Sequence, residues 1–389
     1  MPNRQSSFDV AVVGAGVIGL AVAWRAARRG MKVVVLEREA RAGAGTSNVA
    51  AGMLAPISEA LAAEQPLMRL GLASVEAYPG FIAELGESTG MDTGYLRCGT
   101  LLVARDRDEA ESLDRELHLR ETLGLAAGRL RSSEARHLEP ALAPTLRLAL
   151  DVPDDHAIDP RKLAAALASA LERAGGELRT GSAVDGVRVA GDRVTGVRMA
   201  QTGEHVAAEQ IVLATGVWSE QIDGLHADAQ VPVHPVKGQI MRLHDPSGPG
   251  LLTRVVRWTG GYLVPRGDGR YVLGATMEER GFDTTVTAGG AFELLRDAYE
   301  LVPSVTELVI DELSAGLRPA TPDNAPAIGA GAISGLHWAT GHFRHGILLA
   351  PITAEIVAAG LAGEDSGMAG ADPNDHFAPT RFAGAPVSA

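Results

Sequence analysis

Three glycines near the N-terminus have the spacing of a dinucleotide-binding turn. They stand in Gly14-Ala-Gly16-Val-Ile-Gly19, after an apolar run and before a helical pattern. The first glycine allows a tight turn, the second lets the backbone approach a pyrophosphate, and the third lets the helix pack closely. The helix N-terminus then offers amide donors and a positive dipole to the phosphates. We therefore expect a bound dinucleotide.

An acidic residue completes this pattern. Glu37 follows the second apolar run, Lys32 to Leu36, where a carboxylate accepts hydrogen bonds from ribose hydroxyls. Its negative charge also disfavours a 2′-phosphate. The motif does not distinguish NAD from FAD, so both dinucleotides remain open at this point.

The surrounding sequence predicts the elements that position this motif. Phe8 to Val13 is a β-rich run, Gly19 to Arg29 reads as a helix, and Lys32 to Leu36 is a second strand, which together make a βαβ unit. Asp159 and Pro160 are a typical N-cap and first residue of a further helix that extends to Arg173. Later runs predict a hairpin and a buried strand, at 184–189 with 193–199 and at 210–214.

The middle of the chain has a different texture. Short strand-like runs cover 239–243, 261–265 and 271–275, and turn-prone residues join the last two. These runs predict an antiparallel layer separate from the N-terminal unit. Helical periodicity follows at 291–301, and 346–360 reads as a buried helix, because Pro351 and Glu355 make it too short and too polar to span a bilayer.

Composition and charge exclude several classes of partner. The formal charge of −13 argues against nucleic acid and anionic membranes as partners. The lone cysteine, Cys98, excludes an intramolecular disulfide and a multi-cysteine metal site, which fits a reducing cytoplasm. No metal-ligand spacing and no nucleophile motif occurs, so we expect no metal.

Several blocks together resemble one flavoprotein family. They are Glu37-Arg38, Gly45-Thr-Ser-Asn-Val-Ala-Ala-Gly-Met53, Ile211-Val-Leu-Ala-Thr-Gly-Val-Trp-Ser219, Gly316-Leu-Arg-Pro-Ala-Thr-Pro-Asp323 and Gly341-His-Phe-Arg-His-Gly-Ile-Leu-Leu-Ala-Pro351. Their order resembles the D-amino-acid, sarcosine and glycine oxidases, and is most similar to the glycine oxidases of thiamine biosynthesis. The resemblance covers the chain to about Gly363 and implies FAD.

The resemblance also assigns cofactor contacts. In addition to the glycine turn, it implies that the adenosine half is held by Val17, Ile18, Glu37 and Arg38, with the backbone of Val184 beside the adenine. The residues implied to line the flavin are Thr46, Ser47, Ala51, Gly52 and Met53. Those implied to approach it from the start of the last helix are His342, Phe343, Arg344, His345, Gly346, Ile347 and Leu348.

Four residues are implied to act at the substrate. Arg318 matches the family's carboxylate-binding arginine, whose planar fork suits bidentate recognition. Tyr262 matches a tyrosine whose hydroxyl adds a second bond to that carboxylate, and Arg344 is implied as a third contact. Met277 is implied as an apolar wall that limits side-chain size.

The implied activity is oxidative deamination of glycine and other small amines or amino acids. The amine transfers a hydride to FAD, the imine hydrolyses, and oxygen reoxidises the cofactor with release of hydrogen peroxide. The family's covalent flavin cysteine is matched here by Gly316, so we expect noncovalent FAD. The alternatives are a D-amino-acid dehydrogenase or oxidase of the same fold, an NAD-dependent dehydrogenase and a noncatalytic flavoprotein; a homo-oligomer is possible for each.

The expected architecture is an α/β fold with two interleaved parts. One is a discontinuous, doubly wound, Rossmann-like FAD-binding domain made of residues 1–85, 145–228 and 316–363. The other is an antiparallel-sheet substrate domain made of residues 86–144 and 229–315. Residues 364–389 lack periodicity and are expected to form a loose tail.

Overall fold

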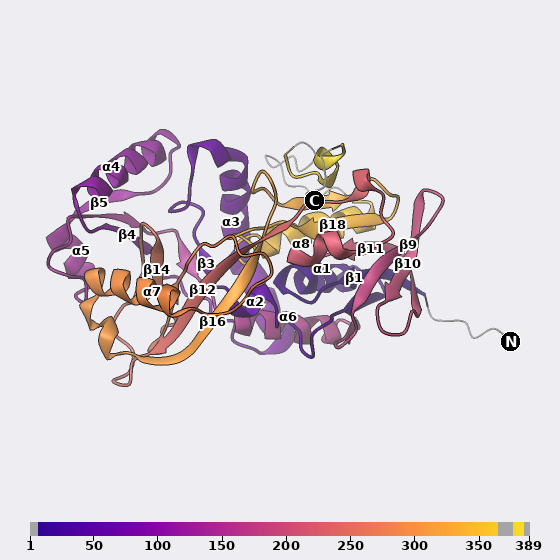
Figure 1. Ribbon diagram of the computed structural model, residues 1–389, viewed down its shortest axis with the longest axis horizontal. Helices are drawn as coiled ribbons and strands as arrows, with labels where there is room; N and C mark the ends of the chain where they lie inside the picture. The colour runs from indigo at the N-terminus through magenta and orange to yellow at the C-terminus, as the bar shows by residue number, and fades with distance from the viewer. Residues whose placement is uncertain (1–6, 365–375, 385–389) are drawn as a thin grey trace.

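The computed structural model describes residues 7–364 and 376–384. Its strands form two large sheets, each of eight strands, which lie in opposite halves of the molecule (Figure 1). A short antiparallel pair, β3 (Met53–Leu54) with β7 (His156–Ala157), is separate from both sheets. The predicted α/β class with a second, antiparallel part is confirmed.

The first sheet contains the predicted βαβ unit. Its strands run in the order β17-β18-β11-β1-β2-β8, parallel from β18 to β8, and the predicted hairpin β9–β10 joins it through β11. Its members are β1 (Phe8–Val13), β2 (Val33–Leu36), β8 (Glu177–Arg179), β9 (Val184–Ala190), β10 (Arg193–Met199), β11 (His205–Leu213), β17 (Ala327–Ala330) and β18 (Leu336–Thr340).

Both faces of this sheet are buried, since alternate side chains of β1 pack into two different hydrophobic clusters. Val10 and Val12 pack in a cluster with α1 (Val17–Arg28), α6 (Pro160–Arg173) and α8 (Ala350–Ala362). Ala11 and Val13 face the opposite cluster, which includes the hairpin β9–β10. As predicted, Asp159 caps α6, since its carboxylate accepts from the backbone of the first turn.

The second sheet runs in the order β16-β12-β15-β14-β13-β4-β6-β5. All its neighbouring strands are antiparallel except β13 and β4, which are parallel. Its members are β4 (Thr100–Ala104), β5 (Gly128–Arg131), β6 (Leu148–Val152), β12 (His234–His244), β13 (Val255–Trp258), β14 (Gly261–Pro265), β15 (Arg270–Gly274) and β16 (Val309–Ala320).

The remaining helices pack on the second sheet or on the helices that cover the first. α7 (Ala288–Leu301) packs its buried side against the second sheet, and α3 (Gln65–Thr89) packs against α6 and α8. The others are α2 (Thr46–Val49), α4 (Arg107–Thr122) and α5 (Ser132–Leu138), with short 3₁₀ helices at Ala62–Glu64, Gly216–Gln221, Ala227–Ala229, Pro303–Glu307 and Pro379–Phe382. None of the helices in the described ranges is long and apolar enough to cross a membrane.

Two expectations about the chain differ from the structure. Strand β6 and residues 316–320 pair in the second sheet, whereas the predicted boundaries placed them in the FAD-binding part. The prediction of a loose tail is wrong for residues 376–384, because Phe377 and Phe382 are buried in the two clusters around the first sheet. The rest of the predicted tail, 365–375 and 385–389, lies outside the described residues.

Candidate active site

A single cavity of about 1030 Å³ is lined by residues of both sheets. Its volume is at the upper end of the range for small-molecule and cofactor sites. With the exception of Gly19, every residue predicted to contact the cofactor or the substrate lies on its wall. Gly19 instead allows helix α1 to pack closely against the glycine turn, because a Cβ atom there would stand 2.0 Å from the carbonyl oxygen of Gly14.

The glycine turn brings bare backbone to the cavity. Gly14 has φ +101°, and a Cβ atom there would lie 2.6 Å from the carbonyl oxygen of Ala214. Its N–H donates to the carbonyl of Leu36 at 2.8 Å, which fixes the turn against β2. The α1 N-terminus opens directly from this turn at Val17. The arrangement suits a pyrophosphate, which needs close amide donors.

Glu37 braces the loops on either side of it. One carboxylate oxygen accepts from the Ala15 N–H at 2.7 Å, and the other from the Glu39 N–H at 2.9 Å. Each oxygen keeps a further lone pair that a ribose hydroxyl could use. Beside it, the Arg38 guanidinium stacks 3.7 Å from the ring centre of Trp218, a cavity residue that the sequence reading did not single out.

Helix α2 lines the cavity and is tied to helix α1 and to strand β16 of the second sheet. Ser47 Oγ accepts from the Val17 N–H at 3.0 Å, and Thr46 Oγ1 donates to the carbonyl of Leu317 at 2.6 Å. Gly52 follows with φ +79°, where a Cβ atom would lie 2.0 Å from the carbonyl oxygen of Ile158. Any side chain at Gly52 would therefore disturb this wall.

The segment before α8 forms another wall. The predicted helix begins only at Ala350, so His342 to Leu348 make a turn that helix α3 braces. Ser74 Oγ donates to the carbonyl of Leu348 at 2.6 Å, and the Tyr78 hydroxyl donates to that of Ile347. Since a peptide N–H points opposite to its C=O, the Ile347–Leu348 peptide directs its N–H away from α3.

Two histidines in this turn are uncharged at neutral pH. Burial lowers the pKa of His342 to about 3, and its Nε2 lies 3.0 Å from Thr353 Oγ1. Burial also lowers the pKa of His345 to about 4, against the opposing effect of Glu59. They therefore add hydrogen-bonding groups to the site without adding positive charge.

Arg318 and Tyr262 come from strands β16 and β14 of the second sheet. Arg318 Nη1 donates to the carbonyls of Lys237 at 3.4 Å and Thr276 at 3.1 Å. No carboxylate in the described part of the chain lies within ion-pair distance of Arg318. Burial raises the pKa of Tyr262, partly opposed by Arg318, so its hydroxyl remains a donor.

Arg344, by contrast, already has acidic partners. Its guanidinium lies 3.2 Å from Glu59 Oε2 and 3.1 Å from Glu64 Oε2. The structure thus compensates the charge of Arg344 within the protein, and a third substrate contact from it remains a prediction. Met277 lies on the cavity wall but is 66% exposed, so no close packing fixes its position as a wall.

An acidic centre on the cavity wall, Glu59, has no motif that would predict it from the sequence. Burial acts to raise the pKa of Glu59, but the positive charges around it, with Arg257 the largest, hold that pKa below its ordinary value. The Asp155 carboxylate accepts from the N–H groups of Ile57 and Ser58 and so orders the segment that leads to Glu59. Only the fold brings these groups together, since Arg257 belongs to β13 and Asp155 precedes β7.

Comparison with known proteins identifies the family. Residues 9–359 match the family model described as DAO, FAD dependent oxidoreductase.

The chain belongs to this family.

The FAD-dependent oxidoreductase is similar to named relatives along nearly its whole length. It is 36% identical over 353 residues to a glycine oxidase of Geobacillus kaustophilus, covering 90% of this chain and 92% of that protein. A crystal structure of glycine oxidase from Geobacillus kaustophilus superposes with a TM-score of 0.85 at 35% identity, over 92% of this chain and 95% of that one. The predicted relationship to glycine oxidases is confirmed.

A longer relative shares the same identity. The chain is 36% identical over 378 residues to the "Bifunctional protein ThiO/ThiG" of Trichormus variabilis, covering 96% of this chain and 55% of that protein. The FAD-dependent oxidoreductase therefore spans about half the length of this bifunctional relative.

The site's own features fit FAD. The glycine turn gives amide donors without side chains, Glu37 keeps acceptors for a ribose, and the cavity continues past α2 to the second sheet. No group of three or more His, Cys, Asp or Glu side chains in the described residues could hold a metal ion. The backbone amides of the glycine turn and the carboxylate of Glu37 are the groups that suit a dinucleotide.

Proposed function

We propose that this protein oxidises glycine with oxygen and water to glyoxylate, ammonia and hydrogen peroxide, in the service of thiazole formation for thiamine. The observation that carries the proposal is Arg318, a cavity guanidinium with no carboxylate partner among the described residues. Support also comes from relatives named glycine oxidase and ThiO. The proposed cofactor contacts are those that the sequence predicted, with FAD held noncovalently.

In this proposal the chain's residues mainly bind and orient the substrate. Arg318 holds the carboxylate through parallel N–H bonds, and the Tyr262 hydroxyl donates a further bond to it. Together they fix the α-carbon against the flavin-binding wall formed by α2 and the turn before α8. Bound FAD supplies a two-electron acceptor. No protein base is required, because the neutral amine is the reacting form.

The proposal includes the compartment in which the protein works, its electron acceptor and its domain organisation. Cys98 is the one cysteine of the sequence, so no intramolecular disulfide requires an oxidising compartment. We infer that the protein works in the cytoplasm, with oxygen as its electron acceptor. The two interleaved domains are proposed with the predicted boundaries, apart from β6 and residues 316–320, which pair in the second sheet.

A steady-state assay tests the function. Glycine, sarcosine and D-alanine are supplied in turn to the purified holoprotein in air, and glyoxylate or pyruvate, ammonia and peroxide are measured. We expect glycine to give glyoxylate and peroxide in equal amounts. Faster turnover of D-alanine would instead assign the protein to D-amino-acid oxidation, and no product from any of the three would contradict an amine oxidase.

A further inference from the structure

The part of the cavity wall formed by Ala51 and Gly52 is held by an arginine of the second sheet. Arg266 directly follows β14, and its side chain continues the row of alternate side chains that includes Tyr262 and Val264. Val264 packs in one hydrophobic cluster with Ala51, and Tyr262 packs against that cluster. This face of β14 therefore lies against the segment that is predicted to line the flavin.

The guanidinium of Arg266 binds the two carbonyls that flank Gly52. Its Nη2 donates to the carbonyl of Ala51 at 2.6 Å, and its Nη1 donates to that of Ile158 at 2.9 Å. The Ile158 N–H in turn donates to the carbonyl of Gly52 at 2.9 Å, which fixes the turn with φ +79° at this glycine. Because Arg266 itself is absent from the cavity wall, the Ala51 carbonyl is directed away from the cavity.

The same contact orients the N–H of Gly52. A peptide N–H points opposite to its C=O, so the Ala51–Gly52 peptide directs this N–H to the cavity side. Gly52 is buried, and its N–H has no acceptor among the residues that the structure describes. Buried amides are nearly always paired, so a bound molecule is the expected acceptor. In the segment predicted to line the flavin, that molecule is FAD.

Arg266 is positively charged but has no acidic partner in the described part of the chain. Its Nε is buried without a hydrogen-bond partner, and no carboxylate there lies within ion-pair distance of the guanidinium. Burial lowers the pKa of Arg266 to about 10, with Asp159 opposing this effect, so the group is charged at neutral pH. The Asp159 carboxylate is itself engaged by the first turn of α6. The charge of Arg266 is therefore uncompensated.

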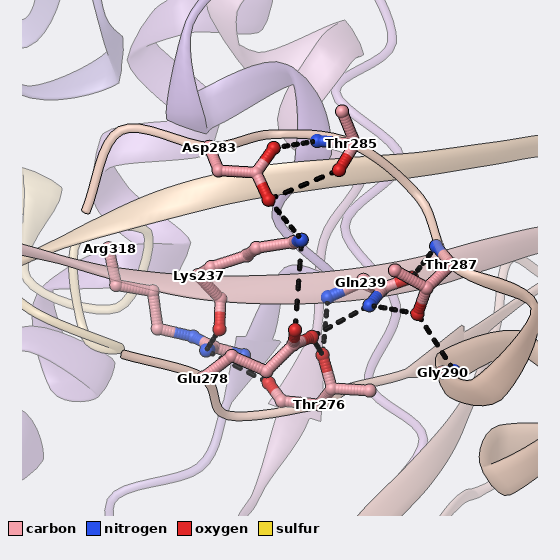
Figure 2. Close-up of polar contacts among 9 residues, drawn as sticks. All are labelled: Lys237, Gln239, Thr276, Glu278, Asp283, Thr285, Thr287, Gly290 and Arg318. Atoms are coloured by element: carbon pink, nitrogen blue, oxygen red, sulfur yellow. Dashed lines mark hydrogen bonds and ion pairs between the residues drawn. The ribbon is translucent and has the colours of Figure 1, made fainter. Parts of the chain in front are cut away.

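Lys237, another cation of the second sheet, shows the contrast. This buried lysine of β12 has its Nζ 3.3 Å from Asp283 Oδ2 and 3.7 Å from Glu278 Oε2 (Figure 2). Its charge is thus balanced within the protein, whereas the charge of Arg266 acts on the groups around it.

The charge of Arg266 also acts at the substrate end of the cavity. Burial raises the pKa of Tyr262, and the positive charges of Arg318 and Arg266 oppose that rise. Reduction of FAD by two electrons adds negative charge to the ring, and a positive charge close to a flavin favours the reduced form. A guanidinium bound to a peptide of the cavity wall meets this condition.

We propose that Arg266 is a positioning residue for the flavin, which turns the Gly52 N–H toward the ring and raises the reduction potential of FAD through its charge. The hydrogen bond to the Ala51 carbonyl sets the direction of the N–H, and the guanidinium supplies the positive field from the far side of the same peptide. The proposal depends on FAD, which the family establishes, and not on the identity of the amine.

Sulfite is the probe, because its lone pair adds to oxidised flavin and leaves the ring negatively charged without any external reductant. Sulfite binding to the holoprotein is followed through the loss of flavin absorption, with midpoint potential, FAD content and thermal unfolding recorded for each variant. We expect Arg266→Gln, which keeps an amide donor but loses the charge, to bind sulfite about tenfold more weakly. Its midpoint potential should be lower by about 30 mV, which is the same factor for two electrons. Arg266→Lys, which keeps the charge, should stay within about threefold of the natural protein.

Comparison of the two variants separates the charge from a purely structural tie. Equal sulfite affinities for Arg266→Gln and Arg266→Lys would overturn the proposal, and so would unchanged affinity in Arg266→Gln. If Arg266→Gln retains no FAD, a sulfite affinity of Arg266→Lys as weak as that expected for glutamine is the result that overturns it.

Arg242→Met is the matched control. The Arg242 Nη2 donates to the carbonyl of Asn48 in α2 at 2.8 Å, but its charge is partly balanced by Glu312, whose Oε2 lies 3.8 Å from Nε. This variant loses a tie to the cavity wall without unbalancing the charge as Arg266→Gln does, so sulfite should bind to it almost normally. A loss of affinity as large as that of Arg266→Gln would overturn the proposal.

Discussion

The guanidinium of Arg318 lies directly against the backbone of Gly238 on the neighbouring strand. A Cβ atom at residue 238 would stand 2.5 Å from Nη2 and 2.6 Å from Nη1. The clamp thus depends on a glycine that has no role in the dinucleotide turn. Tyr262 has a similar dependence, since a Cβ atom on Gly274 would lie 2.7 Å from its hydroxyl oxygen.

Gly238→Ala should therefore displace Arg318 while leaving the sheet intact, because the clash is with the end of a flexible side chain. We expect the KM for glycine to rise by about 10²-fold. Steady-state kinetics with circular dichroism checks this. Gly128→Ala, in strand β5, is the control, because a Cβ atom there meets nothing within 4 Å. A KM within twofold of the natural value for Gly238→Ala would refute this account of the clamp.

Removing the hydroxyl of Tyr262 should also weaken substrate binding. Tyr262→Phe loses a donor to a charged carboxylate, so we expect the KM for glycine to rise about tenfold or more, with a smaller change in kcat. Burial raises the pKa of this hydroxyl, so it stays protonated, and the variant's deficit in KM should be equal at neutral pH and at about pH 9. A deficit that vanishes at the higher pH would contradict this.

The FAD should leave the protein on denaturation. Cys98 is absent from the cavity wall, and burial raises the pKa of its thiol to about 11, which leaves little thiolate for attachment. Acid precipitation should give a colourless pellet and a yellow supernatant. A yellow pellet would show a covalent bond.

The features that could be predicted from the sequence are mostly those formed by residues close together in the chain. The glycine turn, Glu37 and the Asp159 cap each depend on neighbours within one or two elements, so their spacing predicts their geometry. The roles predicted for Arg318 and Tyr262 depend on the family resemblance, because an arginine before a proline has no local feature that marks a ligand contact.

What escaped prediction depends on contacts across the chain. Arg344 meets Glu59 and Glu64, about 280 residues earlier, and no periodicity relates them. Lys237 resembles a surface lysine in sequence, yet it is buried where β12 pairs with Glu278. The absence of periodicity in 364–389 predicts a loose tail, but the buried rings of Phe377 and Phe382 anchor residues 376–384 to the rest of the protein.

Stability should fall in mild acid. Burial lowers the pKa of His337 from 6.5 to about 4, so the folded protein binds fewer protons than the unfolded chain between these values. The contribution of neutral, buried His337 to the free energy of unfolding is therefore complete above pH 6.5. It is lost progressively as the pH falls toward 4. His337→Gln should reduce this slope by up to about 1.4 kcal/mol per pH unit, measured by urea unfolding with FAD held constant.

An exposed histidine provides the control for that measurement. His118 has 84% of its side chain exposed, so His118→Gln should leave the slope unchanged. Equal slopes for the natural protein and His337→Gln would mean that His337 is not buried as a neutral group.

We propose that this FAD-dependent oxidoreductase captures glycine through Arg318, and reduction of the flavin by glycine tests this most directly. Glycine is added without oxygen to the natural holoprotein and to Arg318→Leu, and the flavin bands are followed before air returns. We predict bleaching of the natural protein and recovery in air with peroxide, while Arg318→Leu keeps its FAD but needs about 10²-fold more glycine. Bands that glycine leaves intact in the natural protein, or equal bleaching of both proteins, would contradict the account.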